Sequence, residues 1–362
     1  MKLTLHLTGR CDLDCDYCPA DKSGGRMAEK TLYAACDFAF SIGKTAGLCF
    51  FGGEPLLEKE LIYKAVERCE ELSRRTGKPA EFRMTTNGTH LDTGFLSMAK
   101  SCGMVIGLSF DGLMQDVSRK RPDGSGTFDT VSSNAKLLIS EMPESVAMMT
   151  VSPKAAGRYA ESVRYIASLG FRNISATIAY GSRVRWTEKD ISVLRAELEK
   201  IAEFCSAGIV HSPRPVMFAP LDCRIMGLIY GKNASSQCSF LSGQLTSDVN
   251  GDIYRCTQFI GDERHYLGNV FDGIDIKRQY DLMKQVRIPE QCISCDMRER
   301  CSNICGCNNR LETGDENKVS PLICTYERML TEIADLTARK LCRDHREEFV
   351  RRYGAPIPGI TE

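Results

Sequence analysis

From residue 3 to residue 179 the chain alternates short apolar runs with longer stretches in which apolar residues recur at helical spacing. The short runs predict strands at Leu3–Leu7, Gly47–Phe51, Glu81–Thr86, Val105–Phe110, Val146–Val151 and Asn173–Ala179. The stretches between them predict helices at Ala28–Ile42, Lys59–Thr76, Thr93–Cys102, Phe128–Glu141 and Ala155–Leu169. Repeated strand–helix units connect parallel strands by right-handed crossovers. The pattern predicts an α/β fold, a partial (β/α)6 TIM-like barrel whose functional loops follow the carboxyl ends of the strands.

The strand–helix alternation ends after Ala179. Thr187, followed by two acidic residues, predicts the start of a helix that runs to about Phe204. The segment 213–215, Pro-Arg-Pro, then predicts a bridge between domains.

Residues from about 221 to 324 show little helical periodicity and are rich in Gly, Asn, Asp and Cys. Such a region lacks the apolar content for a large core, and small modules of this kind are commonly held together by metal. A charged amphipathic helix is predicted from Thr325 to about Tyr353. We therefore expect a barrel over residues 1–210, a bridge and cysteine-rich domain over 211–330, and a helix with a tail over 331–362.

Composition and charge limit the classes of protein that fit. The chain has 362 residues, is 43% apolar and 26% charged, and carries 47 basic and 47 acidic side chains, which is ordinary for a soluble protein of two or three domains. Zero net charge gives no electrostatic reason to expect nucleic acid or a membrane surface as a partner. No apolar run is long enough for a membrane span, and the first residues lack a secretory signal, so we expect a cytoplasmic protein.

Only the cysteines are unusual, with 18 in the chain. Disulfides are not expected, because thiols stay reduced in the cytosol. Isolated cysteines within apolar or helical patterns are expected to pack as small hydrophobic side chains; these are Cys36, Cys49, Cys69, Cys102, Cys205 and Cys342. The remaining cysteines are grouped, and grouped thiols favour a metal centre.

The first group is Cys11, Cys15 and Cys18, in the spacing C-x3-C-x2-C directly after the first predicted strand. A zinc site would require a fourth ligand, and no matched second pair lies nearby. A [4Fe–4S] cluster held by three cysteines leaves one iron open to an external ligand. This spacing after the first strand, with Tyr17 before the last cysteine, resembles that of radical SAM enzymes. The alternative, a zinc finger, would explain none of the loops that follow.

Gly52-Gly53-Glu54-Pro55, after the second predicted strand, resembles the GGEP motif of the same family. Glycines allow close backbone approach, and a carboxylate accepts hydrogen bonds from an ammonium group. The resemblance implies that Glu54 binds the amino group of S-adenosylmethionine (SAM). Further SAM-facing residues implied by it, each also explicable as a turn or cap residue, are Thr86, Asn87, Ser109, Asp111 and Arg121, the last as partner of the SAM carboxylate.

The reaction implied by the resemblance is reductive cleavage of SAM. The amino and carboxylate groups of SAM chelate the open iron, and one electron from the reduced cluster breaks the sulfonium bond. Methionine and a 5′-deoxyadenosyl radical result, and the radical abstracts hydrogen from the substrate. The protein binds and orients the reactants and excludes water.

A second group of cysteines resembles the seven-cysteine SPASM extension found on some radical SAM enzymes; its members are Cys238, Cys256, Cys292, Cys295, Cys301, Cys305 and Cys324. Gly251 precedes Cys256 as in that family, and residues 267–270, Leu-Gly-Asn-Val, resemble its LGN segment. The resemblance implies two auxiliary [4Fe–4S] clusters, hence three in total. A pair of zinc ribbons would fit the paired spacing but not the radical SAM half beside it.

The resemblance also implies how the ligands divide. The first auxiliary cluster would take Cys238, Cys256 and Cys305, with Cys223 as the upstream fourth ligand. Cys223 lies farther from Cys238 than in some relatives, so a packed thiol and an open cluster remain the alternative. The second cluster would take Cys292, Cys295, Cys301 and Cys324, and Cys307 would be surplus.

Two differences between this sequence and known subgroups of the family bear on the identity of the substrate. Anaerobic sulfatase-maturing enzymes carry an Asp directly after the second SPASM cysteine, where it acts as a base; here Thr257 and Gln258 follow Cys256. Many thioether-forming maturases carry a leader-peptide-binding domain before the first cluster, and Cys11 leaves no room for one. We expect leader recognition by a separate protein or by the barrel surface.

Three hypotheses follow. The first is oxidative modification of a ribosomally made, Cys-containing precursor peptide, giving a thioether or carbon–carbon crosslink. The second is formylglycine formation of the sulfatase-maturing type. The third is a non-catalytic iron–sulfur or zinc scaffold. Either enzyme would require a flavodoxin- or ferredoxin-type electron donor.

Overall fold

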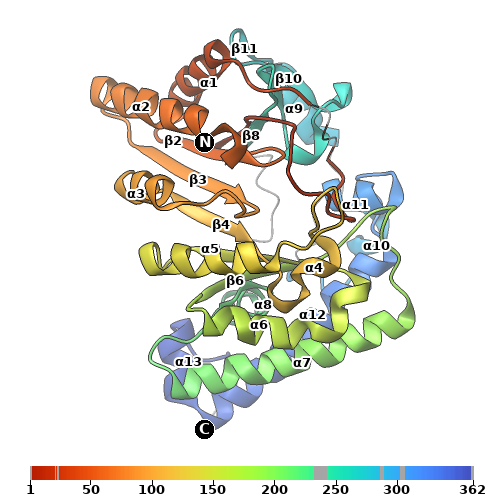
Figure 1. Ribbon diagram of the computed structural model, residues 1–362. Coiled ribbons are helices and arrows are strands. Elements are labelled where there is room, and N and C mark those ends of the chain that lie inside the picture. Colours follow the sequence, from red (N-terminus) through yellow and green to blue (C-terminus); the bar gives the residue numbers. More distant parts are fainter. Residues whose placement is uncertain are drawn as a thin grey trace. The chain divides into compact units, whose positions relative to one another are not determined.

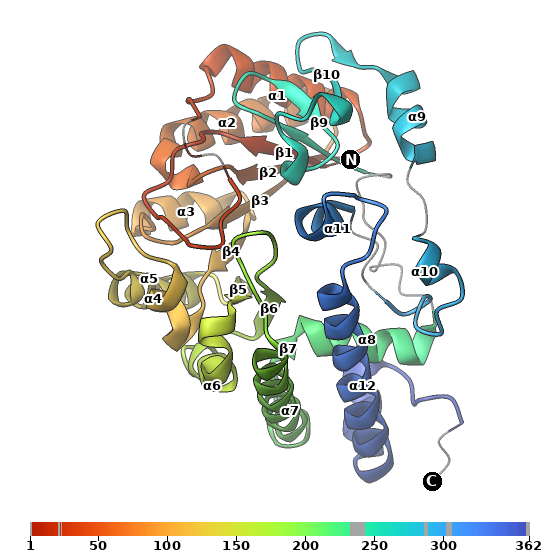
Figure 2. The same cartoon turned by 90° about the vertical axis from the view of Figure 1, so that its right-hand side faces the viewer.

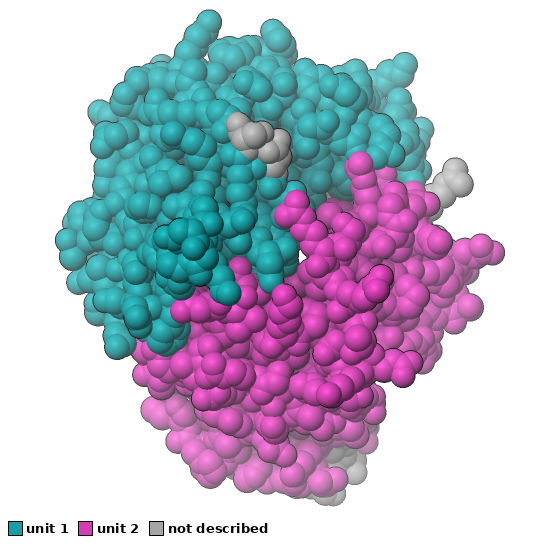
Figure 3. Space-filling view, turned by 45° about the vertical axis from the view of Figure 1, so that its right-hand side comes forward, with its two compact units in different colours: residues 1–109, 119–145, 239–286 teal, residues 110–118, 146–238, 287–362 magenta. Residues whose placement is uncertain are grey.

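The computed structural model describes residues 2–20, 22, 24–231, 243–285, 289–301 and 306–359. Contacts divide the chain into two compact units, shown in teal and magenta in Figure 3. Unit 1 comprises Met1–Ser109, Arg119–Ser145 and Ser239–Val286, and unit 2 comprises Phe110–Ser118, Val146–Cys238 and Arg287–Glu362.

Unit 1 is built on a sheet whose central strands are parallel. In sheet order, these are β8 (Gln244–Ser247), β1 (Lys2–His6), β2 (Ala46–Phe51), β3 (Ala80–Thr86) and β4 (Val105–Ser109). Beyond β8 the sheet continues with antiparallel strands, namely β9 (Asp252–Tyr254), β10 (Tyr266–Asn269) and β11 (Gly273–Ile274). The carboxyl ends of β1, β2, β3 and β4 therefore meet at one edge of this sheet.

Helices cover this sheet because the strands are buried and apolar. Leu3 and Leu5 of β1 and Phe50 of β2 are fully buried. The connecting helices are α1 (Glu29–Ser41), α2 (Lys59–Thr76), α3 (Thr93–Ser101) and α5 (Phe128–Glu141). Figure 1 shows α1, α2 and α3 on the same side of the strands that they connect. The unit also contains helix α9 (Ile276–Gln285) and three short helices, η1 (Pro55–Glu58), η6 (Thr257–Phe259) and η7 (Glu263–His265).

Unit 2 contains three parallel strands and most of the long helices. Its strands are β5 (Val146–Val151), β6 (Asn173–Ile178) and β7 (Met217–Phe218). Its longer helices are α6 (Tyr159–Ser168), α7 (Glu188–His211), α8 (Ala219–Tyr230), α12 (Pro321–Asp344) and α13 (Arg346–Tyr353). Its short helices are η2 (Gly112–Met114), α4 (Gln115–Ser118), η3 (Pro153–Arg158), α10 (Glu290–Ile293) and α11 (Gly306–Thr313). Helix α12 packs against both α7 and α8, as Figure 2 shows.

The prediction of an α/β fold on parallel strands is confirmed, and the bounds of β5, α2 and α5 agree with those predicted. Other bounds differ. Helix α7 continues to His211 instead of ending near Phe204, because its buried face continues through Cys205 and Ile209. Its start is as predicted, with Thr187 and Asp190 forming a reciprocal capping box.

Three expectations for the second half were wrong. The stretch from residue 219 to 230 is a helix, α8, and residue 325 lies inside α12, which begins at Pro321. The predicted final helix is two helices, because His345 adopts φ −144° and ψ 58° and ends α12. Residues 213–215 lead into β7.

The predicted division into domains and the curvature of a partial barrel stay predictions. None of the helices in the described ranges combines the length and apolar character that crossing a lipid bilayer requires.

Candidate functional site

The loop after β1 carries the first group of cysteines. Cys11, Cys15 and Cys18 are all partly exposed, and the Cys18 amide closes a turn on the Cys15 carbonyl at 3.1 Å. Burial raises the pKa of Cys11 to about 12, with smaller contributions from the charges of Glu54, Asp12 and Cys15. A bound metal reverses this effect by stabilising the thiolate. The loop thus offers three thiols that a metal cluster would deprotonate.

The two glycines of the GGEP segment let it lie directly against the chain that leads into Cys11. The amide of Gly53 donates to the Thr8 carbonyl at 2.8 Å, and the amide of Glu54 donates to the Arg10 carbonyl at 2.9 Å. A Cβ atom on Gly53 would lie 2.0 Å from the Arg10 carbonyl oxygen. Gly52 has φ +128°, and a Cβ there would lie 2.4 Å from the Thr8 oxygen. The close approach inferred from these glycines is thus an approach to the cysteine loop.

Glu54 is buried, with 1% of its surface exposed, where β2 leads into η1. Its carboxylate accepts hydrogen bonds from Thr86 Oγ1 at 2.6 Å, the Asn87 amide at 2.7 Å and the Leu56 amide at 3.0 Å. Burial raises the pKa of Glu54 to about 7, although these bonds oppose the shift. An ionised carboxylate has about four acceptor positions. One position is therefore left for a ligand cation. Pro55, directly after Glu54, begins the short helix η1.

Asn87 connects the end of β3 to the cysteine loop through Asp12. Its Nδ2 donates to Asp12 Oδ1 at 2.7 Å, and Thr89 Oγ1 donates to Asp12 Oδ2 at the same distance. His90 Nε2 lies 3.4 Å from Asp12 Oδ2. The sequence motifs indicated Asn87 but not Asp12, Thr89 or His90, because no motif marks an Asp beside a candidate ligand cysteine.

Of the other predicted SAM-facing residues, Arg121 has hydrogen-bond partners outside the cysteine loop, and Asp111 lies in the other unit. The guanidinium of Arg121 donates to the Gly126 carbonyl at 2.5 Å and to Thr130 Oγ1 at 3.4 Å, both in its own segment. Ser109 ends β4 and is partly exposed. Asp111 belongs to unit 2, where its Oδ1 accepts the amide of Thr150 at 2.8 Å.

Arg119 also contacts the cysteine loop, and no sequence motif indicated it. It is buried, with 7% exposed, and its guanidinium lies 5.6 Å from the centre of the Tyr17 ring. The amide of Asp14 donates to the Lys120 carbonyl at 2.7 Å, which joins the same two segments. A cation over an aromatic face is a stabilising contact. Arg119 therefore supports the part of the loop that precedes Cys18.

Glu58, at the end of η1, holds both ends of the cysteine loop. Its buried carboxylate, 5% exposed, pairs with Arg10 Nη2 at 2.8 Å and with Arg26 Nε at 2.5 Å. Arg10 directly precedes Cys11, and Arg26 forms a β-bridge with Thr8 where the loop returns. The carboxylate thus connects the entry and the exit of the loop, and no sequence motif indicated it.

We expect Glu58→Gln to weaken the cysteine loop, because the amide cannot pair with both guanidinium groups. Both arginines are about half exposed, so the expected loss of stability is modest, roughly 1–3 kcal/mol. Loss of iron to a chelator from the reconstituted protein should be faster than in the parent. Glu71→Gln, which removes an exposed ion pair on α2, the helix that directly follows η1, is the matched control. Equal rates of iron loss in the two variants would contradict the role of Glu58.

The second group of cysteines is partly brought together, in unit 2. The pKa of Cys292 is raised by burial and then by the charges of Cys295 and Cys324, which places these three thiols within electrostatic range. Cys301 is partly exposed at the end of the same segment. Cys307 is buried in α11.

Two of the four predicted ligands of the first auxiliary cluster lie in the described residues, one in each unit. Cys223 is exposed on α8 in unit 2, and Cys256 precedes η6 in unit 1. Cys238 and Cys305 lie outside the described residues.

The grouped cysteine thiols nevertheless suit iron–sulfur clusters. Within the described ranges, no three His, Cys, Asp or Glu side chains already converge as a metal site. Thiols are the ligands that such clusters take, and three from one short loop leave an iron for an external ligand. The first loop, with Glu54 beside it, meets this requirement.

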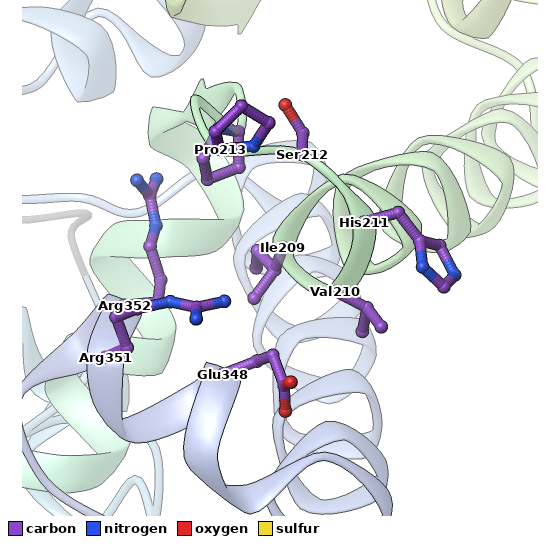
Figure 4. A pocket seen from close by; sticks show the side chains of 9 residues that line it. Ile209, Val210, His211, Ser212, Pro213, Glu348, Arg351 and Arg352 are labelled. Carbon is purple, nitrogen blue, oxygen red and sulfur yellow. The ribbon is translucent and has the colours of Figure 1, made fainter.

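Unit 2 also holds a pocket of about 500 Å³ between the end of α7 and α13. Figure 4 shows Glu348, Arg351 and Arg352 of α13 beside Ile209, Val210 and His211 of α7. The residues that line it also include Ser212, Pro213 and Pro215. None of the residues predicted for the site lines this pocket.

Comparison with known families decides between the metal centres considered. Residues 5–166 match the family described as the radical SAM superfamily. The chain belongs to the radical SAM superfamily. The radical SAM resemblance is thereby confirmed, and the chain is an enzyme rather than a non-catalytic scaffold. When bound, the cluster of this family supplies the electron for cleavage of SAM.

Relatives of this radical SAM enzyme extend the similarity beyond residue 166. An uncharacterized protein of Methanocaldococcus jannaschii is 30% identical over 285 residues, which cover 76% of this chain and 90% of that one. A serine-type anaerobic sulfatase-maturating enzyme of Klebsiella aerogenes is 22% identical over 339 residues, 85% of this chain and 80% of that one.

Solved structures share the fold over nearly the whole chain. The structure of anSMEcpe with bound AdoMet superposes with a TM-score of 0.81 and 18% identity, covering 98% of both chains. SuiB of Streptococcus suis bound to S-adenosylmethionine superposes with a TM-score of 0.63 and 16% identity, covering 89% of this chain and 76% of that one. This radical SAM enzyme therefore shares the fold of these two SAM-binding proteins.

Proposed function

We propose that this enzyme oxidatively modifies a ribosomally made peptide, forming a thioether or a carbon–carbon crosslink. The observation that carries the proposal is the whole-chain similarity to enzymes solved with peptides bound. The structure of anSMEcpe contains the Cp18Cys peptide, and that of SuiB contains the precursor peptide SuiA. The substrate class that we propose is accordingly a Cys-containing precursor peptide.

The proposed cofactors are SAM and three [4Fe–4S] clusters. Cys11, Cys15 and Cys18 would hold the SAM cluster, and Glu54 would accept a hydrogen bond from the amino group of SAM at its remaining acceptor position. The proposed auxiliary ligands are Cys223, Cys238, Cys256 and Cys305 for the first cluster and Cys292, Cys295, Cys301 and Cys324 for the second. Proximity of Cys292, Cys295 and Cys324 supports the second set.

The residue after Cys256 bears on the type of reaction. Thr257 Oγ1 is hydrogen-bonded to His6 Nε2, and burial lowers the pKa of His6 to about 4. A hydroxyl group is a far weaker base than a carboxylate, so this position cannot deprotonate a substrate as an Asp would. This favours crosslinking over formylglycine formation. Formylglycine formation is the second candidate, because a relative and a structural neighbour are sulfatase-maturing enzymes.

The proposal includes an electron donor and a means of peptide recognition. Reduction of the SAM cluster requires a flavodoxin- or ferredoxin-type protein. Recognition of the leader is assigned to a separate leader-binding protein or to the surface of the barrel.

Anaerobically reconstituted enzyme, incubated with dithionite, SAM and candidate Cys-containing peptides, tests the proposal. We expect about 12 iron atoms per chain, release of 5′-deoxyadenosine, and a peptide lighter by two hydrogens that does not react with an aldehyde probe. Cys15→Ala is the inactive control. A peptide that gains an aldehyde would support the second candidate, and stoichiometric zinc without iron would refute both.

A further inference from the structure

One cation of unit 2 contacts the second group of cysteines directly. Arg328 lies on α12 one helical turn after Cys324, and residues four apart share a helix face. Its Nη2 donates to Cys295 Sγ at 3.2 Å and to Asp296 Oδ1 at 3.0 Å. The Arg328 side chain is also hydrogen-bonded to Cys324. A single guanidinium thus contacts two of the three thiols that lie together.

The geometry suits a guanidinium better than an ammonium group. A planar fork with five N–H donors can reach two sulfur atoms and a carboxylate at once, whereas Lys presents a point charge. Asp296 orients the fork, since its carboxylate binds the same nitrogen that donates to Cys295. As an exposed pair, Arg328 and Asp296 contribute little to stability.

We propose that Arg328 raises the reduction potential of the second auxiliary cluster, which rests on the proposed ligation by Cys292, Cys295, Cys301 and Cys324. Reduction adds negative charge to the cluster and its sulfur ligands. N–H donors and a positive charge at those sulfurs stabilise the reduced form more than the oxidised form. The step is a one-electron reduction: the cluster gains an electron, and Arg328 keeps its protons and forms no covalent bond. A higher potential makes this cluster the better acceptor for an electron from the substrate.

The test is a redox titration of the anaerobically reconstituted full chain, reduced with dithionite and followed by electron paramagnetic resonance. All variants carry Cys11→Ala, Cys15→Ala and Cys18→Ala, which remove the SAM cluster. Adding Cys292→Ala identifies the signal of the second auxiliary cluster by its loss. Arg328→Gln is then compared with Arg328→Lys and with Arg343→Gln, a control that removes an exposed ion pair on the same helix.

We expect Arg328→Gln to lower the equilibrium constant for reduction about tenfold, a shift of about 59 mV for one electron. Arg328→Lys should give a smaller shift, because the charge stays and the fork is lost. Arg343→Gln should leave the midpoint unchanged. Equal midpoints for Arg328→Gln and Arg343→Gln would overturn the inference while leaving the proposed function intact. If Cys292→Ala removes neither iron nor signal, both the inference and the proposed second cluster are refuted.

Discussion

Replacing Gly53 with alanine is expected to destroy the proposed SAM site although it adds only one methyl group. The new Cβ would lie 2.0 Å from the carbonyl oxygen of Arg10 and 2.6 Å from that of Gly9. Both contacts are with backbone, so no side-chain rotation can relieve them, and the segment leading into Cys11 has to move. We expect a loss of about 3 kcal/mol or more in the free energy of unfolding, and little iron retained after reconstitution.

The matched control is Gly25→Ala in the same loop, where an added Cβ meets nothing within 4 Å. Urea unfolding and iron content should both be near those of the parent protein. The prediction concerning Gly53 would be contradicted if Gly53→Ala bound iron and unfolded like Gly25→Ala.

The second large effect is expected for Glu54→Gln. In the proposed site the ionised carboxylate would accept a charge-assisted hydrogen bond from the amino group of SAM, worth roughly 1.5–3 kcal/mol, whereas a neutral amide would not. SAM should therefore bind roughly 10- to 100-fold more weakly to the variant. Glu60→Gln, an exposed substitution on α2, should bind SAM like the parent.

The pH dependence of SAM binding makes this prediction specific. Because burial raises the pKa of Glu54 to about 7, the carboxyl group is largely protonated at pH 6 and ionised at pH 8. The proposed hydrogen bond from the amino group of SAM is charge-assisted only when Glu54 is ionised. Affinity, measured by equilibrium dialysis, should therefore rise with pH up to about 7 and level off above it. Glu54→Gln should show no such rise; a parallel rise in both proteins would assign the titration to another group.

Contacts between neighbouring parallel strands were predictable from the sequence. The motif after β2 and the residues after β3 were expected at one edge of a sheet, and Glu54 does bind Thr86 and the Asn87 amide. Apolar periodicity also placed α2 and α5 correctly, because long amphipathic helices carry the strongest periodic signal.

Contacts that depend on single side chains far apart in sequence were not predictable. Nothing in the local pattern marks Glu58 as the partner of both Arg10 and Arg26, or Arg119 as the partner of Tyr17. Strand β8 was missed for a related reason: four residues are too few to show periodicity, and its identity comes from pairing with β1.

Strand β1 is an interior strand of its sheet only because β8 covers its second edge, with Lys2 opposite Gln244. An uncovered edge presents unpaired N–H and C=O groups that promote aggregation. The region that matches the radical SAM superfamily, residues 5–166, is therefore not a separable module for engineering. A chimaera that exchanges the cysteine-rich half between radical SAM enzymes has to keep β8 with β1, so its junction belongs after residue 285 and not after the last strand of the matched region.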